Sequence, residues 1–279
     1  MTGRCLADYR PADRERAVGA LLSVAEMLGD LMSSDLTVVG GLVPALIVPQ
    51  PDGSGPETHC GTLDVDLGLS LALPHQRRYA EVSARLRQAG FRPTTDGDGE
   101  PVPYRWRTPD HLSRVSIDFL IARRCGQDPA DDFERLERDL VAVRTPGLQL
   151  VARDWVLVSA SGIALEGAPA VHEVRVCGPG AFAVLKARAL RGRSRPKDAY
   201  DLTYVLERFP GGVAAVAEAL RPLLDDPDAQ EAVAWLGEDF ARIDSAGPVR
   251  AAEFVQGGRD DVLQADARGL VRELLRLIG

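Results

Sequence analysis

Long hydrophobic runs are absent from this sequence, and no uninterrupted apolar stretch reaches the roughly 18 residues that a membrane-spanning helix needs. The first residues, Met1–Arg16, are charged and polar, which does not fit a secretory signal peptide. Cysteines are few, and Cys5, Cys60, Cys125 and Cys177 lie far apart without a Cys-x-x-Cys pair, so neither a zinc site nor a disulfide framework is indicated. These absences predict a cytoplasmic protein without a membrane partner.

Positive charge is in deficit, since 33 Lys and Arg residues against 41 Asp and Glu residues give a net charge of −8. Affinity for nucleic acid comes largely from neutralised phosphates, so an acidic protein binds a polyanion poorly unless basic residues cluster locally. One such cluster is present at residues 186–197. With 279 residues, of which 45% are hydrophobic, the chain has ample length for a core, either as one large domain or as two modest ones.

The most informative stretch is Thr62–Leu71, in which apolar residues alternate with Asp64, Asp66, Gly68 and Ser70. This period of two predicts a strand with two unlike faces and places both carboxylates on the same face. Like charges about 7 Å apart along one strand repel each other, so a cation or a substrate is expected beside them. Two carboxylates suit Mg²⁺ (or Mn²⁺), which completes its shell with water and phosphate oxygens. The alternative is a solvent-exposed strand face that binds nothing.

A glycine pair, Gly40 and Gly41, stands between a short β-rich run and a short predicted helix. Glycine lets backbone N–H groups approach a phosphate closely, and the start of a helix adds partial positive charge. A later predicted strand at 115–120 has Asp118 at its centre. Together, the glycine turn, the Asp-x-Asp strand and the third carboxylate predict a site for a nucleoside triphosphate (NTP) with one or two metal ions.

In this order of elements the sequence resembles the nucleotidyltransferase superfamily with the polymerase-β-like fold. The residues that carry the resemblance are Gly40, Gly41, Asp64, Asp66 and Asp118. The resemblance implies an α/β (α+β) fold with a mixed sheet, three metal-binding carboxylates, and nucleotide binding by the glycine pair and by Thr62. A loop at 49–61 makes the gap between the glycine pair and the carboxylates longer than this superfamily usually shows.

The segment at 185–202 carries the second group of candidates. Lys186 lies in an otherwise apolar helical pattern, and a buried lysine is costly without an anionic partner. Gly192 is expected to end this helix, and Asp198 and Asp201 lie three residues apart on the next one, hence on one face. The alternative for the arginines is a solvent-exposed helix end, where their charge interacts favourably with the helix dipole.

This segment narrows the resemblance to the AbiEii/AbiGii-type toxin nucleotidyltransferases, which include the MenA-like toxins of type IV toxin–antitoxin systems. The likeness extends over about residues 35–205. It implies that Lys186 contacts the triphosphate, that Arg193 and Lys197 neutralise phosphates, and that Asp198 acts as an acid or base or orients Lys186. It also implies an RNA acceptor, such as a tRNA 3′ end, and a cognate antitoxin as partner.

The periodicities predict a mixed α/β part at 1–178 and a helical domain at 179–279. The resemblance implies that the first part is a nucleotidyltransferase-like domain. The segment at 93–103 is expected to be a loop, because it is rich in Pro, Gly and Asp. Helices are expected at 11–32, 42–48, 75–89, 133–141, 181–191, 197–208, 213–224, 228–242 and 261–278. Strands are expected at 36–39, 62–71, 104–107, 115–120, 148–151, 155–158, 163–165 and 171–176.

Two hypotheses of function follow. The first is a Mg²⁺-dependent nucleotidyltransferase that moves a nucleoside monophosphate from an NTP to an acceptor hydroxyl, with Asp118 assisting deprotonation of that hydroxyl. It is expected to be a toxin acting on RNA, with a small-molecule or protein acceptor as alternatives. The second is a catalytically inactive nucleotidyltransferase fold used for binding or regulation. Retention of all three carboxylates argues against the second, because an unpaired acidic cluster costs stability.

The histidines His59, His75, His111 and His172 are dispersed, near loops or helix starts. All four are expected to be surface or helix-capping residues, although the loop before Thr62 can bring His59 over the site.

Overall fold

The computed structural model describes residues 5–50, 58–62, 64–69, 76–95, 101–109, 112, 115–123, 132–137 and 140–279. These residues form one nine-stranded mixed sheet in the order β3-β4-β5-β2-β1-β9-β8, with β7 beside β5 and β6 beside β7. The strands are β1 (Leu36–Val39), β2 (Asp64–Leu69), β3 (Arg92–Thr95), β4 (Pro101–Arg107), β5 (Ser116–Ala122), β6 (Phe133–Arg135), β7 (Val141–Thr145), β8 (Trp155–Ile163) and β9 (Pro169–Cys177). The mixed α/β fold expected from the sequence is confirmed.

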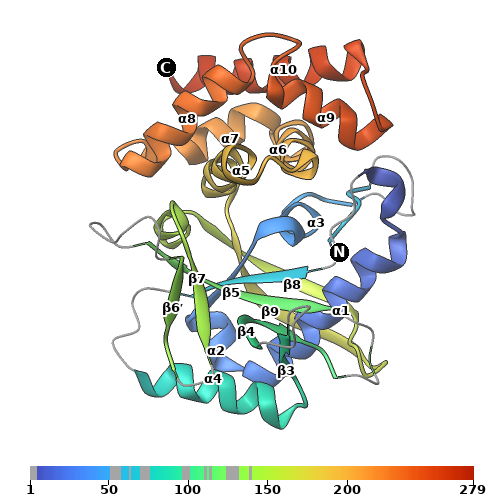
Figure 1. Cartoon of the computed structure of the whole chain (residues 1–279), viewed down its shortest axis with the longest axis vertical. Coiled ribbons are helices and arrows are strands. Elements are labelled where there is room, and N and C mark those ends of the chain that lie inside the picture. Colours follow the sequence, from blue (N-terminus) through green and yellow to red (C-terminus); the bar gives the residue numbers. More distant parts are fainter. Residues whose placement is uncertain are drawn as a thin grey trace.

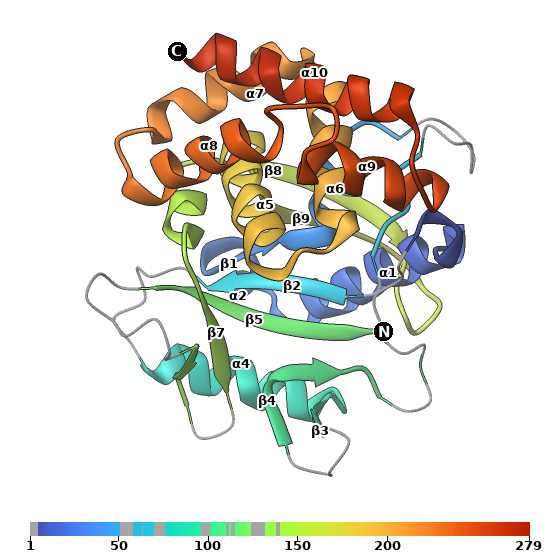
Figure 2. The same ribbon diagram turned by 45° about the horizontal axis from the view of Figure 1, so that its top comes forward.

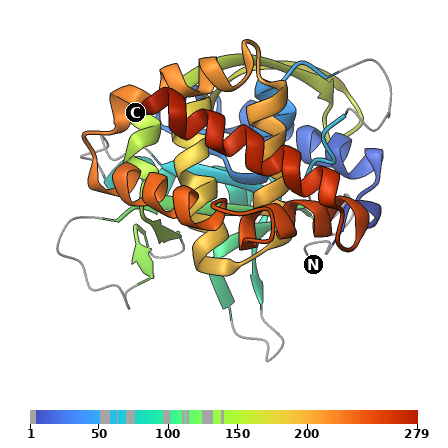
Figure 3. The ribbon, with the colours of Figure 1, turned by 90° about the horizontal axis from the view of Figure 1, so that it is seen from above.

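Helices lie on both sides of this sheet. Those of the first part are α1 (Pro11–Leu28), α2 (Asp30–Ser34), α3 (Val43–Ile47) and α4 (Gln76–Gln88), with 3-10 helices η1 (Leu6–Asp8), η2 (Gly40–Leu42) and η3 (Leu148–Ala152). Those of the second part are α5 (Pro179–Arg193), α6 (Pro196–Arg208), α7 (Gly212–Leu220), η4 (Arg221–Leu223), α8 (Pro227–Asp239), α9 (Ala246–Gln256) and α10 (Asp261–Ile278). Figure 1 shows α5 to α10 gathered into a layer above the sheet, and Figure 3 shows α10 crossing the top of that layer.

Strand register places the carboxylates on one face. β2 and β5 are parallel, with Asp66 opposite Asp118, and β1 and β2 are antiparallel, with Val39 opposite Asp66. Val65 and Leu67 alternate with the carboxylates and are fully buried, so the expected period of two in this strand is confirmed. Figure 2 shows β2 and β5 side by side, with α5 and α6 above them.

The predicted loop at 93–103 is wrong at both of its ends. Arg92–Thr95 and Pro101–Arg107 are antiparallel strands β3 and β4, with a register shift between Pro93 and Thr94. Proline is tolerated at sheet edges and bulges because it leaves no ladder hydrogen bond unmade there. β3 is the outermost strand of the order, so the turn-forming composition did not exclude strand pairing.

The helix predicted at 133–141 is also wrong. Phe133–Arg135 and Val141–Thr145 are strands β6 and β7, and β7 continues along the edge of β5 beyond the end of β4. β6 pairs with β7, and β7 pairs in turn with β5, so tertiary pairing decides the conformation here. The strand predicted at 148–151 is likewise wrong, since these residues lie in 3-10 helix η3.

The helical layer differs from expectation at two points. α5 does not end at Gly192 but continues to Arg193, and Ser194 follows with a left-handed backbone at φ 53°. Helix α9 was not predicted; Gly247 and Pro248 lie in its first turn. Every helix in the described part of the chain is too short or too polar to span a bilayer.

The start of α5 is fixed by the sheet. Asp154, just before β8, accepts a hydrogen bond of 2.7 Å from the backbone N–H of Ala181, in the first turn of α5. Burial raises the pKa of Asp154. Buried apolar side chains form one continuous cluster that includes both the strands and α5 to α10. The division into domains 1–178 and 179–279 therefore stays a prediction, although α5 does begin at Pro179.

Candidate active site

The glycine turn packs directly against the Asp-x-Asp strand. Gly40 has a left-handed backbone at φ 71°, and a Cβ at this position would lie 1.9 Å from Oδ2 of Asp66. A Cβ at Gly41 would lie 3.0 Å from Oγ1 of Thr62 and 3.6 Å from Nζ of Lys197. Only glycine fits Gly40, because both its conformation and the neighbouring carboxylate exclude a side chain. The turn thus meets Thr62, Asp66 and Lys197, three of the predicted site residues.

The three carboxylates of the sheet lie within electrostatic reach of one another. Burial, and then the negative charges of Asp118 and Asp64, raise the pKa of Asp66 to about 7, although Arg193 and Lys186 oppose this rise. Burial also raises the pKa of Asp64; the charge of Asp118 adds to the rise and that of Arg105 counteracts it. Negative charge on this wall is therefore incompletely compensated by the protein itself.

Asp118 already has a protein partner. Arg105, opposite Asp118 on the antiparallel neighbour β4, donates from Nε to Oδ1 at 2.8 Å and from Nη2 to Oδ2 at 2.6 Å. Hydrogen bonding to Asp118 raises the pKa of the Arg105 guanidinium. Sequence reasoning missed Arg105, since the alternation with buried Trp106 indicates its face but not the strand against which it pairs.

Among the described residues, no group of three or more His, Cys, Asp or Glu side chains converges as a metal centre. The engagement of Asp118 by Arg105 is consistent with this result. Within the part of the chain that the structure describes, Asp64 and Asp66 have no such arginine clamp.

The opposite wall is a buried lysine–aspartate cluster of Lys186, Lys197, Asp198 and Asp201, joined by Arg193. Lys186 Nζ donates to Asp198 Oδ1 at 2.9 Å and to Asp201 Oδ2 at 2.5 Å. Lys197 Nζ donates to Asp201 Oδ1 at 2.6 Å. Arg193 donates two hydrogen bonds of 2.8 Å to Asp198. The predicted burial of Lys186 is confirmed, since it is only 4% exposed.

Charge in this cluster is compensated. Burial alone would raise the pKa of Asp198, but Lys186 and Arg193 lower it to about 2. Lys186 and Lys197 overcome burial in the same way and hold the pKa of Asp201 far below its usual range. Burial opposes the charged form of Lys197, yet Asp201 raises the pKa of this lysine. Three cations against two anions leave the cluster with one surplus positive charge, and the charges of Arg193 and Lys186 lower the pKa of Asp66.

The prediction that His59 lies at the surface or caps a helix is wrong. The residue is 2% exposed, and its Nε2–H donates to Asp201 Oδ1 at 2.9 Å. The backbone N–H of Gly61 donates to Nδ1 at 3.0 Å, which places the ring proton on Nε2. The ring stacks on Tyr200 at 5.3 Å between centroids and meets Tyr204 edge-on at 4.9 Å. Its position just before a predicted strand gave no signal of this contact with α6.

Of the other three histidines, one lies in the described part of the chain. His172 is half-buried on β9, and His75 and His111 lie outside the described residues.

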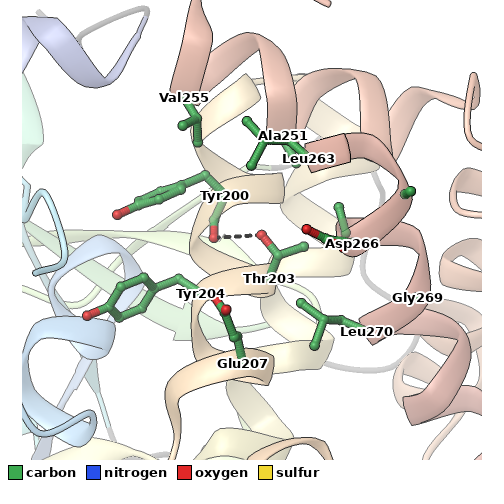
Figure 4. A pocket seen from close by; sticks show the side chains of 12 residues that line it. Tyr200, Thr203, Tyr204, Glu207, Ala251, Val255, Leu263, Asp266, Gly269 and Leu270 are labelled. Atoms are coloured by element: carbon green, nitrogen blue, oxygen red, sulfur yellow. Dashed lines mark hydrogen bonds between the residues drawn. The ribbon is translucent and has the colours of Figure 1, made fainter. Parts of the chain in front are cut away.

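A pocket of about 510 Å³ lies between α6, α9 and α10 (Figure 4). Its lining includes Tyr200, Thr203, Tyr204 and Asp266 but no predicted site residue. Tyr200 and Tyr204, one turn apart on α6, line this pocket and also contact His59. They therefore lie between the pocket and the buried lysine–aspartate cluster.

The comparison with known families agrees with this geometry. A family model described as "Nucleotidyl transferase AbiEii toxin, Type IV TA system" matches residues 62–278. The chain belongs to this AbiEii family. The expected family is thereby confirmed, and nucleotidyl transfer and a place in a type IV toxin–antitoxin system, with its antitoxin, are what membership implies. The match begins at Thr62, so the assignment of Gly40 and Gly41 rests on the packing described above. No curated protein matches the chain closely enough to count as a relative.

The structure thus brings together two sets of predicted residues. The first set lies on the sheet side and comprises Gly40, Gly41, Thr62, Asp64, Asp66 and Asp118. The second lies on α5, α6 and the turn between them and comprises Lys186, Arg193, Lys197 and Asp198. Their roles in binding and catalysis stay predictions.

Proposed function

We propose that this AbiEii-family protein transfers a nucleoside monophosphate from an NTP to an acceptor hydroxyl with the aid of Mg²⁺ or Mn²⁺. The acceptor oxygen bonds to the α-phosphorus, the bond from that phosphorus to the bridging oxygen breaks, and pyrophosphate leaves. One observation carries the proposal: the glycine turn lies between Asp66 and Lys197. A triphosphate with its metal fits between an acidic wall and a basic one, because it carries both signs of charge.

The cationic side suits the phosphates. Lys197 lies beside Gly41, and the charges of Lys186 and Arg193 reach Asp66. In phosphoryl and nucleotidyl transfer the protein mainly positions the groups and stabilises charge that develops on the leaving phosphates. The backbone N–H groups of Gly40 and Gly41, with Thr62, would add uncharged donors to the same phosphates. Asp198 would orient Lys186, because a carboxylate with a pKa of about 2 is a poor base at neutral pH.

The acidic side suits a divalent cation. Mg²⁺ in nucleotide sites is bound through one or two carboxylates and completes its shell with phosphate oxygens and water. Asp64 and Asp66 supply that donor set, and the raised pKa of Asp66 at about 7 indicates a negative site that a cation would relieve. When bound, the metal supplies charge stabilisation to the triphosphate.

Asp118 would accept the proton of the acceptor hydroxyl. Both of its oxygens hold Arg105, yet an ionised carboxylate has about four lone-pair sites, so it can accept a further hydrogen bond without releasing the arginine. Arg105 would keep this carboxylate oriented toward the face that it shares with Asp66. We propose RNA, such as a tRNA 3′ end, as the acceptor; a small molecule or a protein is the alternative.

The test is transfer of label. Purified protein is incubated with each α-³²P NTP, Mg²⁺ and total RNA, beside the Asp64→Ala/Asp66→Ala variant. Label in RNA with the unaltered protein alone is expected and identifies the base, whereas label on protein would indicate a protein acceptor. Absence of transfer, together with absence of Mg²⁺-dependent NTP binding in calorimetry, would overturn the proposal and leave a catalytically inactive binding protein.

A further inference from the structure

We infer that His59 is a positioning residue, which supplies Asp201 with an uncharged hydrogen-bond donor and so leaves Lys197 and Lys186 directed at the triphosphate. The inference rests on the proposed function, because its effect is on nucleotide binding.

Asp201 is the centre of the arrangement. It is fully buried, and its two oxygens accept hydrogen bonds from three side chains. Oδ2 accepts from Lys186, whereas Oδ1 is shared between Lys197 at 2.6 Å and His59 at 2.9 Å. A buried carboxylate whose lone pairs are left unsatisfied is costly, and any neighbouring donor is drawn toward it. His59 therefore competes with Lys197 for the same oxygen.

The charge state of the donor matters. A third cation at the Asp201 carboxylate would repel Lys186 and Lys197, whereas a neutral N–H satisfies Oδ1 without adding charge. Burial lowers the pKa of His59 to about 4, so the ring is neutral at physiological pH, and the hydrogen bond from Gly61 N–H to Nδ1 leaves Nε2 as the donor. The positive charge of the lysines then stays available to a phosphate.

The ring is firmly held. Its own backbone N–H donates to Oε1 of Gln50 at 3.0 Å, and the hydroxyl of Tyr204 reaches the same Oε1 at 3.4 Å. Stacking on Tyr200 fixes the plane of the ring. Because Thr62 follows three residues later and packs against Gly41, the contact with Asp201 also ties the start of the Asp-x-Asp strand to α6.

Two substitutions distinguish the effect of the hydrogen-bond donor at His59 from the effect of the shape of its ring. His59→Phe keeps a stacking ring but removes the donor, and His59→Gln places an amide N–H near the position of Nε2. We expect His59→Phe to weaken binding of the α,β-methylene analogue of the transferred NTP about tenfold, the effect of losing one hydrogen bond to a charged group. His59→Gln should restore affinity to within about threefold of the unaltered protein. The KM for the NTP should follow the same order, with a smaller change in kcat.

The measurements are calorimetric binding of the analogue with Mg²⁺, steady-state transfer, and thermal unfolding of each variant. If His59→Phe does not fold, His59→Asn takes its place, because its shorter amide cannot reach Asp201. Equal losses of affinity in the Gln and Phe (or Asn) variants would indicate a purely structural role, and full affinity in His59→Phe would exclude any role. Both outcomes overturn the inference while wild-type transfer continues. Failure of the unaltered protein to bind or transfer any NTP would instead overturn the proposed function.

Discussion

The two walls of the site treat the same residue type in opposite ways. On the sheet, Asp66 lies beside two further carboxylates, and its pKa is raised to about 7. On α6, Asp198 is even less exposed than Asp66, but it is held by Lys186 and Arg193, and its pKa is lowered to about 2. The negative charge of Asp66 is left for a ligand to neutralise, whereas that of Asp198 is neutralised by cations of the protein itself. Burial alone does not distinguish a ligand site from a structural ion pair; the balance of neighbouring charge does.

The largest expected effect comes from removing the uncompensated charge. Asp66→Asn should lower the rate of nucleotidyl transfer by about 10³-fold or more, the scale seen when one electrostatic contributor to a transition state is lost. The protein should still fold, because the substitution removes repulsion rather than a partner. Transfer measured with labelled NTP, beside thermal unfolding of the same preparation, checks both statements. Substantial residual transfer would mean that Asp66 does not hold the metal.

Substitution in the lysine–aspartate cluster should, by contrast, destabilise the folded protein. Lys186→Met leaves Asp198 and Asp201 with fewer counter-charges and should lower the free energy of unfolding by about 3 kcal/mol, as well as abolishing transfer. Adding Asp198→Asn should recover much of the stability, because it removes one buried anion and leaves Arg193, which is half exposed, to solvent. It should not recover transfer.

Chemical denaturation of the single and double variants measures this difference. A control is Arg242→Ala, which breaks an exposed pair with Asp244 and should change stability by less than about 1 kcal/mol. If Lys186→Met were as mild as this control, the cluster would not be the compensated site described here.

Much of the site could be predicted because its signals are local. A period of two fixes the face shared by Asp64 and Asp66, and spacing along a helix fixes that of Asp198 and Asp201. The glycine pair marks a turn whatever the surrounding fold. What the sequence alone cannot supply is pairing between distant segments. Arg105 and Asp118 are neighbours only through the β4–β5 register.

His59 shows the same limit in another form. It belongs to a turn-rich loop, and only packing against Tyr200 and Tyr204 on α6 makes it a buried residue. The helix predicted at 133–141 is wrong for a related reason, since β6 in this segment pairs with β7, which itself lies along the edge of β5. Local pattern thus predicted the residues of each wall, whereas the contacts between the walls required the fold.

The raised pKa of Asp66 makes the stability of the protein depend on pH. The pKa of Asp66 is raised from 3.8 to about 7 in the folded protein, so the folded state holds a proton that the unfolded state has lost between these values. Stability should therefore decrease as pH rises from about 4 to about 7, and the penalty is complete above that range. Metal-free Asp66→Asn lacks this penalty, so its Tm should exceed that of the unaltered protein by at least about 2–4 °C at pH 8 and by progressively less toward pH 4.

Mg²⁺ provides the matched control. At pH 8 it should raise the Tm of the unaltered protein but not that of Asp66→Asn, because only the former has the charge that the ion neutralises. Thermal unfolding across the pH range, with and without Mg²⁺, gives both results. A Tm difference between the two proteins that does not vary with pH would contradict the raised pKa.

The smallest expected effect concerns Arg105, a cation that contacts Asp118 on the acidic wall. Arg105→Gln keeps a donor near Asp118 but removes the positive charge that lowers the pKa of Asp64. Protons should then compete with Mg²⁺ more strongly, so the acid limb of the pH profile of metal binding should move to higher pH, by about half a unit for an interaction screened by solvent. Mg²⁺ titrations between pH 5.5 and 8.5 measure this limb. Because the Arg105 side chain is 37% exposed and that of Lys186 only 5%, Arg105→Gln should lower metal-free stability less than Lys186→Met does. A loss as large as that of Lys186→Met would show that Asp118 depends on Arg105 as strongly as Asp198 and Asp201 depend on Lys186.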